Sequence, residues 1–298
     1  MEELLEVKQQ IKTFVEEIGD EKSLELLEHL AQGKMLRSKL ILKIAGANSD
    51  SIRLCAIVEM IHAASLLHDD VIDDANTRRG QASVNALYDN KTAIMFGDIL
   101  YSKAFTELTQ MDKRIAYKVA NAVTLLSVGE LLDVELTKSF NNSYDKYMDM
   151  IYKKTASLIE ASAASAAILA GLDEKKYALY GKNLGLAFQM IDDILDITQE
   201  SQKLGKPAML DFVEGKVTIP YLLLHERLDN KKDLEDLYQK ELNDEETLWI
   251  KTKMQETSAL DDSKKQAKEL GLEAINSVKD ENNDALVLIM QAMIEREY

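Results

Sequence analysis

Apolar residues recur every three or four positions along most of this 298-residue chain. This spacing is typical of helices that bury one face. Two of the clearest stripes are Leu54, Ile57, Val58, Ile61 and Ala64, and Leu184, Ala187, Phe188, Ile191 and Leu195. Apolar and polar residues do not alternate, as they would in strands, over any useful length. The pattern therefore predicts an all-α protein.

Five interruptions divide the helical pattern. They lie at 46–50, 79–83, 139–143, 171–173 and 199–215. None of them resembles a Ser/Pro/Gly-rich linker between domains. Proline, which breaks helix interiors, occurs only at Pro207 and Pro220. We expect a single all-helical domain over residues 1–298, with roughly ten or more helices packed around one interior.

The charge and the cysteine content indicate which partners and which cell compartment the protein fits. The net charge is −16, from 36 basic and 52 acidic residues, which argues against nucleic acid and against docking on anionic lipid. The one cysteine, Cys55, cannot form an internal disulfide and fits a reducing compartment. The first residues contain no apolar signal core, and no charge-free apolar run is long enough to span a bilayer. We therefore expect a cytoplasmic protein without a transmembrane segment.

A cluster of four carboxylates ends the first apolar stripe. These are Asp69, Asp70, Asp73 and Asp74. On a helix, Asp69 and Asp73 lie one turn apart. Carboxylates in a poorly solvated cleft repel one another strongly, and a divalent cation would remove that cost. Magnesium prefers such oxygens, with water and substrate phosphate completing its shell.

The same spacing returns at the end of the second stripe. Asp192, Asp193 and Asp196 repeat the arrangement of the first cluster. One such cluster is a weak signal, because acidic surface turns often produce it and a solvated helix face explains it. Two copies, each at the end of an apolar helix, favour a functional site. Two facing helices would direct both clusters into one cavity that holds magnesium.

Other metal and phosphate sites fit the sequence poorly. A di-iron bundle needs a pair of Glu-x-x-His units, and only Glu59-x-x-His62 is present. An EF-hand loop requires acids at alternating positions and a glycine in sixth place, which the residues after Asp69 do not supply. Neither Gly-Lys pair after the second cluster has the rest of a Walker loop.

Basic residues recur beside the clusters, as a site for a polyanion requires. They are Arg78 and Arg79 after the first cluster, Lys206 and Lys216 after the second, and Lys34 with Arg37 early in the chain. Each alone is most often a solvated surface charge, but their placement beside buried-looking acids favours binding. His62 lies two turns before the cluster and could reach the same cavity, although a satisfied core histidine is nearly as good an explanation.

With these motifs in place, the chain resembles a trans-type polyprenyl diphosphate synthase. Family members carry G-K-x-x-R, then H-x-x-x-x-x-H-D-D-x-x-D-x-x-x-x-R-R-G, K-T, F-Q-x-x-D-D-x-x-D, G-K-P and E-G-K-x-T-x-P. The matching segments are Gly33 to Arg37, His62 to Gly80, Lys154-Thr155, Phe188 to Asp196, Gly205 to Pro207 and Glu214 to Pro220. Together they are highly specific, and they imply the isoprenoid synthase fold, an all-α bundle around a central cavity.

The resemblance implies a role for each matching position. The metal ligands, for Mg²⁺, would be Asp69, Asp70, Asp73, Asp192, Asp193 and Asp196. The residues that steady an allylic diphosphate would be Arg78, Lys154, Lys206 and Lys216. The isopentenyl diphosphate site would consist of Lys34, Arg37, His62 and Arg79. Thr155 and Gln189 would face a developing carbocation, so the expected catalytic residues are Lys154, Thr155, Gln189, Asp69 and Asp192.

The implied reaction is a prenyl transfer from an allylic diphosphate, expected to be farnesyl diphosphate. Metal and cations stabilise the departing diphosphate, so the carbon–oxygen bond ionises to an allylic cation. The double bond of isopentenyl diphosphate attacks this cation, and the released diphosphate takes the proton that is then lost. No side-chain nucleophile is needed, and the sequence presents no Ser/His or Cys/His arrangement.

The chain departs from the family pattern at a few positions. Gln32 replaces a usual glycine and Ser38 a usual proline, and Met209-Leu210 stand where a smaller pair is common. We expect tuned affinity rather than lost activity.

Product length depends on the residues one helical turn before the first cluster. Ala64 and Ser65 stand where short-chain members have a bulky aromatic residue. Small residues would leave a tunnel open for a long product, octaprenyl by preference, although they also simply permit helix packing. Leu131 and Leu132 are candidates for the tunnel floor.

Three alternatives stay open at this point. A shorter-chain farnesyl or geranylgeranyl diphosphate synthase shares the motifs. A terpene cyclase or head-to-head synthase also uses aspartate clusters, but needs no isopentenyl diphosphate site. A non-catalytic subunit of a heteromeric synthase would tend to lose one cluster, and here both are complete. The resemblance itself implies a homodimer.

Overall fold

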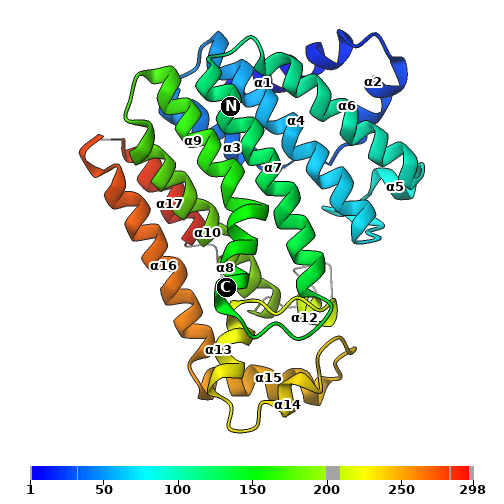
Figure 1. Ribbon diagram of the computed structural model, residues 1–298, viewed down its shortest axis with the longest axis vertical. Helices are drawn as coiled ribbons and strands as arrows, with labels where there is room; N and C mark the ends of the chain where they lie inside the picture. Colours follow the sequence, from blue (N-terminus) through cyan, green and yellow to red (C-terminus); the bar gives the residue numbers. More distant parts are fainter. Residues whose placement is uncertain (1, 32, 199–208, 282, 295–298) are drawn as a thin grey trace. The chain divides into compact units, whose positions relative to one another are not determined.

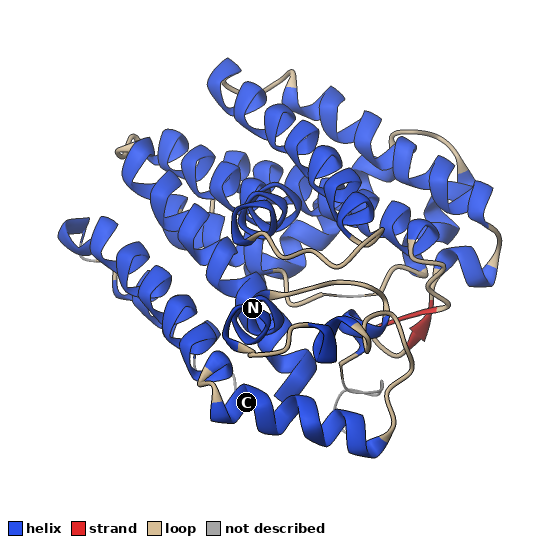
Figure 2. Cartoon of the chain, turned by 60° about the horizontal axis from the view of Figure 1, so that its bottom comes forward, coloured by secondary structure: helices blue, strands red, loops and turns tan. Residues whose placement is uncertain are grey.

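The computed structural model describes residues 2–31, 33–198, 209–281 and 283–294 of the chain. Helices make up almost all of the regular structure in these ranges, and Figure 2 shows the one exception, a two-stranded hairpin. The predicted all-α fold is therefore confirmed. The chain divides into two compact units, unit 1 (Met1–Thr124 and Leu158–Ala178) and unit 2 (Leu125–Ser157 and Leu179–Tyr298). The single domain expected over residues 1–298 stays a prediction.

Unit 1 is built around one long apolar helix. Its elements are α1 (Glu2–Glu16), α2 (Glu21–Glu28), α3 (Leu36–Ala45), α4 (Ser49–Ile72), β1 (Thr77–Arg78), β2 (Gln81–Ala82), α5 (Val84–Leu87), α6 (Asn90–Leu108), the first half of α7 (Lys113–Leu136), most of α9 (Ser157–Ala170) and the start of α10 (Glu174–Thr198). α4 packs against α1, α3 and α6, and Figure 1 shows it running beside α6. The first aspartate cluster therefore ends the central helix of this unit.

The start of α4 is fixed by a capping box. The side chain of Asn48 accepts hydrogen bonds from the backbone N–H groups of Asp50 and Ser51, and the Ser51 hydroxyl accepts one from the Asn48 N–H. This arrangement satisfies donors that the first helical turn would otherwise leave without partners. It sets where α4 begins and so which residues reach its far end.

The hairpin of β1 and β2 presents the two arginines that follow the first cluster. Thr77 pairs with Ala82 and Arg78 with Gln81. The two turn residues, Arg79 and Gly80, have φ values of 53° and 75°, the left-handed conformation that a two-residue hairpin turn requires. The sequence predicted an interruption at this point but not a hairpin, because strands of two residues are too short to show an alternating pattern.

Unit 2 holds the second aspartate cluster and the C-terminal helices. Its elements are the second half of α7, α8 (Tyr144–Ile151), the π-helical turn η1 (Tyr152–Ala156), most of α10, α12 (Leu210–Val213), α13 (Ile219–Arg227), α14 (Lys232–Glu235), α15 (Asp244–Glu256), α16 (Ala259–Ser277), η2 (Lys279–Glu281) and α17 (Asp284–Ile294). α13 and α15 pack on α16, and α16 packs on α17.

Two glycines let α7 and α10 approach η1 closely. A Cβ atom on Gly129 would lie 2.3 Å from the backbone nitrogen of Lys154, and one on Gly185 would lie 2.5 Å from the Cα of Ala156. A real Cβ atom has no room at either distance, so only glycine fits at both positions. The helices on either side of the Lys154-Thr155 pair are therefore held against its backbone.

Most of the predicted interruptions are confirmed. Three of them, 46–50, 139–143 and 171–173, separate α3 from α4, α7 from α8 and α9 from α10. The fifth interruption, 199–215, is described only from residue 209, where it contains α12.

Within the described part of the chain, two helices, α4 and α7, are long and apolar enough to cross a membrane by length and composition alone. The apolar window of α4 is 67% buried within the protein, as expected for the central helix of a packed unit, and that of α7 is 39% buried. The absence of a transmembrane segment stays a prediction.

We expect the substitution Gly185→Ala to destabilise the protein. Alanine gains about 1 kcal/mol over glycine in a helix interior. Forcing a methyl group against the Ala156 backbone costs about 1–3 kcal/mol, which exceeds that gain in most of the range. Urea unfolding monitored by circular dichroism measures the free energy of unfolding. Lys175→Ala, at an exposed position in the same helix, should change it by less than about 0.5 kcal/mol. Equal stability of both variants and wild type would contradict the close approach at Gly185.

Candidate active site

The first aspartate cluster lies on the last turn of α4, as the sequence predicted. Asp69 is half-buried, Asp70 is buried and Asp73, the C-cap residue, is exposed. The C-terminal end of a helix carries partial negative charge, so acids there are disfavoured unless a cation compensates. The placement therefore costs stability in the free protein and favours binding of positive charge.

One arginine of the hairpin already neutralises part of this cluster. The Asp70 carboxylate accepts hydrogen bonds from Nε of Arg78 at 2.7 Å and lies 2.6 Å from its Nη2. The Asp70 side chain is only 6% exposed, and burial strengthens such a pair. In this conformation Asp70 holds the hairpin, while Asp69 and Asp73 lie nearer to solvent.

The residues predicted to bind isopentenyl diphosphate gather in unit 1. Burial lowers the pKa of His62 well below its usual 6.5, and the positive charges of Arg37, Arg79 and Arg78 lower it further. His62 is therefore neutral at pH 7. Burial also lowers the pKa of both Arg37 and Arg79, and their mutual repulsion adds to the effect on Arg37. A group of three arginines around a neutral imidazole is suited to an anion of high charge.

A glycine makes room for Arg79. Its Nη1 donates a hydrogen bond to the carbonyl oxygen of Ala31 at 3.1 Å, and a Cβ atom on Gly33 would lie 2.6 Å from the same Nη1. The early Gly33-Lys34 segment and the hairpin thus meet. Lys34 itself is exposed on this loop. Gln32, which replaces a usual glycine, lies outside the described residues.

Ser38, which stands where the family usually has a proline, makes two hydrogen bonds that a proline could not make. Its backbone N–H and its hydroxyl both donate to Oε1 of Glu59, at 3.2 and 2.7 Å. A proline at this position has neither donor. Glu59 in turn offsets the charges of Arg37 and Arg79 electrostatically. The sequence analysis named Glu59 only as part of the Glu-x-x-His unit and predicted no role for it.

The second aspartate cluster lies near the C-terminal end of α10, in unit 2. Asp193 is buried, and Asp192 and Asp196 are half-buried. Burial raises the pKa of Asp193 well above its usual range, and the charges of Asp211 and Asp192 raise it further. Burial and then Asp211 raise the pKa of Asp196 to about 7. Without a cation, the carboxylates of this cluster repel one another.

Two acids of α7 hold the lysine of the Lys-Thr pair. Lys154 Nζ lies 2.8 Å from Oε2 of Glu130 and 2.5 Å from Oδ2 of Asp133. Both acids are buried, and their attraction outweighs burial, so the pKa of Lys154 is raised. The lysine is charged and fixed on η1. Glu130 and Asp133 are three residues apart on one helix face, which is the only signal for them in the sequence.

A line of hydrogen bonds joins the Lys-Thr pair to the second cluster. The Thr155 hydroxyl donates to Oε1 of Gln189 at 2.8 Å, and Nε2 of Gln189 donates to Oδ1 of Asp193 at 2.9 Å. The hydroxyl of Tyr147 donates to the other oxygen of Asp193 at 2.6 Å. Thr155 and Gln189, predicted to act together, are thus in direct contact. Nothing in the sequence pointed to Tyr147.

The segment after the second cluster places a further acid, Asp211, beside this cluster, although no sequence motif included it. Asp211 is half-buried, and its backbone N–H donates to Oδ2 of Asp196 at 3.3 Å. Burial raises the pKa of Asp211, while the charges of Lys216 and Lys154 lower it. Lys216 also contacts Glu214 at 3.1 Å. Lys206 lies outside the described residues. Asp211 stands five residues before Lys216, within the stretch that carries the family motif.

The donor sets suit a divalent cation bound together with a ligand. Among residues 2–31, 33–198, 209–281 and 283–294, no group of three His, Cys, Asp or Glu side chains is assembled as a metal cage. Magnesium commonly binds through one or two carboxylates, with waters and substrate phosphates completing its shell. The repelling carboxylates at the ends of α4 and α10 offer such oxygens, so the residues fit Mg²⁺. Their role as ligands stays a prediction.

The residues expected to control product length differ in their surroundings. Ala64 and Ser65 are buried in α4, and the Ser65 hydroxyl donates to the carbonyl oxygen of His62. Their effect on product length stays a prediction. Leu131, by contrast, is 68% exposed on α7, which does not fit a residue that closes a buried tunnel. Leu132 is half-buried.

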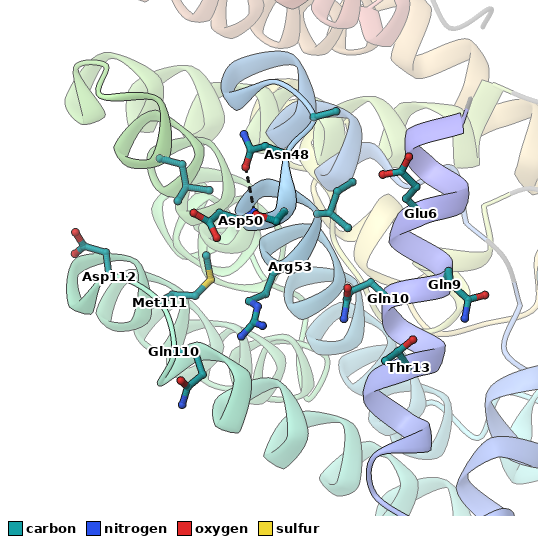
Figure 3. Close-up of a pocket in the computed structure, with 14 residues that line it drawn as sticks. Glu6, Gln9, Gln10, Thr13, Asn48, Asp50, Arg53, Gln110, Met111 and Asp112 are labelled. Atoms are coloured by element: carbon teal, nitrogen blue, oxygen red, sulfur yellow. Dashed lines mark hydrogen bonds between the residues drawn. The ribbon is translucent and has the colours of Figure 1, made fainter.

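A separate hollow of about 890 Å³ lies in unit 1, between α1, the α3–α4 turn and the α6–α7 turn (Figure 3). No predicted site residue lines it. Among the described residues that do, the one cationic side chain is Arg53, which is paired with Glu107 at 3.3 Å. The hollow therefore does not suit a diphosphate.

Comparison with known proteins now decides the family. The sequence profile of the polyprenyl synthetase family matches residues 20–254. The chain belongs to the polyprenyl synthetase family. The predicted family and its prenyltransferase activity are thereby confirmed.

The relatives of this polyprenyl synthetase include enzymes named for short products and enzymes named for long products. It is 33% identical over 291 residues to an octaprenyl diphosphate synthase of Haemophilus influenzae, covering 91% of this chain and 87% of the relative. It is 36% identical over 237 residues to a short chain isoprenyl diphosphate synthase of Methanothermobacter thermautotrophicus, covering 75% and 73%. An octaprenyl pyrophosphate synthase structure from Helicobacter pylori is similar with a TM-score of 0.94 at 42% identity, covering 99% of both chains.

The surroundings of His62 predict that it does not titrate in the neutral range. Because burial and three arginines lower its pKa well below 6.5, the imidazole should stay neutral as pH falls from about 8 to about 6.5. A proton NMR titration, with the His62 signal identified by its loss in His62→Gln, measures this directly. Adding a diphosphate anion should raise the midpoint, since negative charge favours the protonated ring. A midpoint at or above 6.5 in the free protein would contradict the arrangement.

Proposed function

We propose that this polyprenyl synthetase condenses isopentenyl diphosphate with an allylic diphosphate, farnesyl diphosphate being the expected starter. The observation that carries the proposal is the group of arginines around neutral His62 in unit 1. This group of arginines supplies positive charge for one diphosphate, and the lysines of unit 2 supply positive charge for another. A reaction with two diphosphate substrates needs both sets.

In this proposal the chain's own residues bind and orient the two substrates. Arg37 and Arg79, with Lys34 and His62, bind isopentenyl diphosphate. The residues assigned to the allylic diphosphate are Arg78, Lys154, Lys206 and Lys216. Arg78 would then exchange its contact with Asp70 for one with phosphate.

Positive charge develops on the allylic carbon as its bond to oxygen breaks. The oxygens of Thr155 and Gln189 would face this carbon and stabilise the charge, because their lone pairs carry partial negative charge. The double bond of isopentenyl diphosphate then forms the new carbon–carbon bond. The proton lost in the last step goes to the released diphosphate, so no side chain of the protein needs to act as a base.

Magnesium is the proposed cofactor. Asp69, Asp73 and Asp192, with Asp70, Asp193 and Asp196, are the residues that would hold it. Bound Mg²⁺ would offset the charge of the leaving diphosphate. The same ions would relieve the repulsion among carboxylates at the ends of α4 and α10.

We further propose a long all-trans product, octaprenyl by preference. Small residues at 64 and 65, one turn before the first cluster, support this, as does the likeness to octaprenyl synthases of Haemophilus influenzae and Helicobacter pylori. A shorter product is the alternative that the Methanothermobacter relative suggests.

We propose that the enzyme works as a homodimer in the cytoplasm. Exposed apolar side chains on α6, namely Ile94, Met95 and Phe105, support contact with a second copy. The single cysteine and the acidic charge support a reducing compartment without nucleic acid as partner.

The proposal is tested by incubating the purified protein with Mg²⁺, farnesyl diphosphate and radiolabelled isopentenyl diphosphate. We expect labelled polyprenyl diphosphate, and none after removal of divalent metal with a chelator. Arg79→Gln should raise KM for isopentenyl diphosphate about tenfold or more while KM for the allylic substrate changes little, because a charged hydrogen-bonding contact to one substrate is lost. Incorporation of farnesyl diphosphate alone into a hydrocarbon would instead indicate a cyclase, and no turnover at all would indicate a non-catalytic subunit.

Product length is tested by Ala64→Phe. A phenyl ring at this position should shorten the main product, as read by thin-layer or liquid chromatography after dephosphorylation. Retained incorporation of labelled isopentenyl diphosphate by Ala64→Phe serves as the control for general disruption. An unchanged product distribution in Ala64→Phe would contradict the role of residue 64.

A further inference from the structure

Tyr147 belongs to none of the sequence motifs, yet its hydroxyl ends the line of hydrogen bonds that runs through the second cluster. We infer that Tyr147 is a positioning residue for the transfer reaction: through Asp193 it fixes the side-chain amide of Gln189, and through that amide the hydroxyl of Thr155. The inference rests on the proposed function, because that function places Thr155 and Gln189 beside the reacting carbon.

The contacts form a closed path within unit 2. Tyr147 lies on α8, which runs directly into η1, the turn that carries Thr155. From Tyr147 the hydrogen bonds lead to Asp193 and Gln189 on α10, and from Gln189 back to Thr155. The path therefore joins both ends of the α8–η1 segment to one face of α10.

Burial makes this path rigid. The Tyr147 side chain is 1% exposed and Asp193 is 4% exposed. Water cannot replace the tyrosine hydroxyl easily at such a position, and an unsatisfied buried carboxylate oxygen is disfavoured. Tyr147 donates to Oδ2 of Asp193, which leaves Oδ1 directed to Gln189.

The direction of the Gln189 amide decides the sign of its effect on the reaction. A glutamine amide has an acceptor oxygen and a donor nitrogen, which a half-turn of the group exchanges. While Asp193 accepts from Nε2, the Oε1 atom faces Thr155. The Thr155 hydrogen is then engaged with Gln189, so the hydroxyl lone pairs are free to face positive charge. If the amide turned over, its N–H₂ group would take the place of Oε1 and would oppose a cation.

The variant Tyr147→Phe removes one hydroxyl and keeps the ring that packs in the core. We expect kcat to fall about tenfold, since the effect is on charge that develops only in the transition state. KM values for both diphosphates should stay within about twofold, because no substrate-binding cation is altered. The matched control is Tyr144→Phe, on the same helix, whose hydroxyl donates to Gln266 instead. It should retain wild-type kcat.

A double-mutant cycle separates positioning from a general structural effect. If Tyr147 acts through Gln189, the variant Tyr147→Phe with Gln189→Ala should be no slower than Gln189→Ala alone. Multiplicative losses, or a Tyr147→Phe variant with wild-type kcat, would overturn the inference. A rise in KM with unchanged kcat would overturn it as well.

An NMR measurement on the protein without metal or substrate tests the same path independently of activity. In the wild type, the side-chain amide protons of Gln189, identified by their loss in Gln189→Ala, should exchange more slowly than those of exposed glutamines. They should shift in Tyr147→Phe and stay unchanged in Tyr144→Phe. Fast exchange in the wild type would overturn the inference even if Tyr147→Phe did not fold. A wild-type protein that forms no polyprenyl product would instead refute the proposed function, while the exchange result would still report on the hydrogen bonds.

Discussion

Repulsion between carboxylates at the negative ends of two helices is the constraint on which the rest of the site depends. α4 and α10 each carry acids near their C-terminal ends, and all of these except Asp73 and Asp74 are partly or wholly buried, where both the helix dipole and the neighbouring acids disfavour their charge. Such an arrangement is stable only when surrounding groups offset the charge. Each unit does so with its own cations and hydrogen-bond donors, and the offset is incomplete around Asp193 and Asp196, whose pKa values are raised.

The compensating groups also determine what each unit can bind. In unit 1, Arg78 neutralises Asp70, while Arg37 and Arg79 lie around a neutral imidazole and Glu59 offsets part of their charge. Excess positive charge at that point suits an anion. In unit 2, Lys154 is shared by two buried acids and stands one residue before Thr155, so charge and lone pairs are presented from the same π-helical turn.

The helical fold and the family could be predicted from the sequence, for physical reasons. The apolar periodicity predicted the helices, and the spacing of carboxylates and cations in the motifs predicted the family, because both depend on residues close together in the chain. The roles of the individual site residues stay predictions. The hairpin was not predictable, since two-residue strands leave no pattern. Glu59, Glu130 and Tyr147 were missed because their roles come from contacts between distant segments, and such contacts leave no mark on local spacing. Leu131 was one of two candidates for a tunnel floor, whereas its side chain is exposed.

The central claim is that each aspartate cluster binds a divalent cation together with a diphosphate. It is tested most directly by anomalous X-ray diffraction from crystals grown with Mn²⁺ and a non-hydrolysable allylic diphosphate analogue. The account predicts Mn²⁺ peaks at about 2.1 Å from carboxylate oxygens of each cluster, with phosphate oxygens of the analogue completing their shells. Peaks at one cluster only, or none beside either cluster, would contradict it.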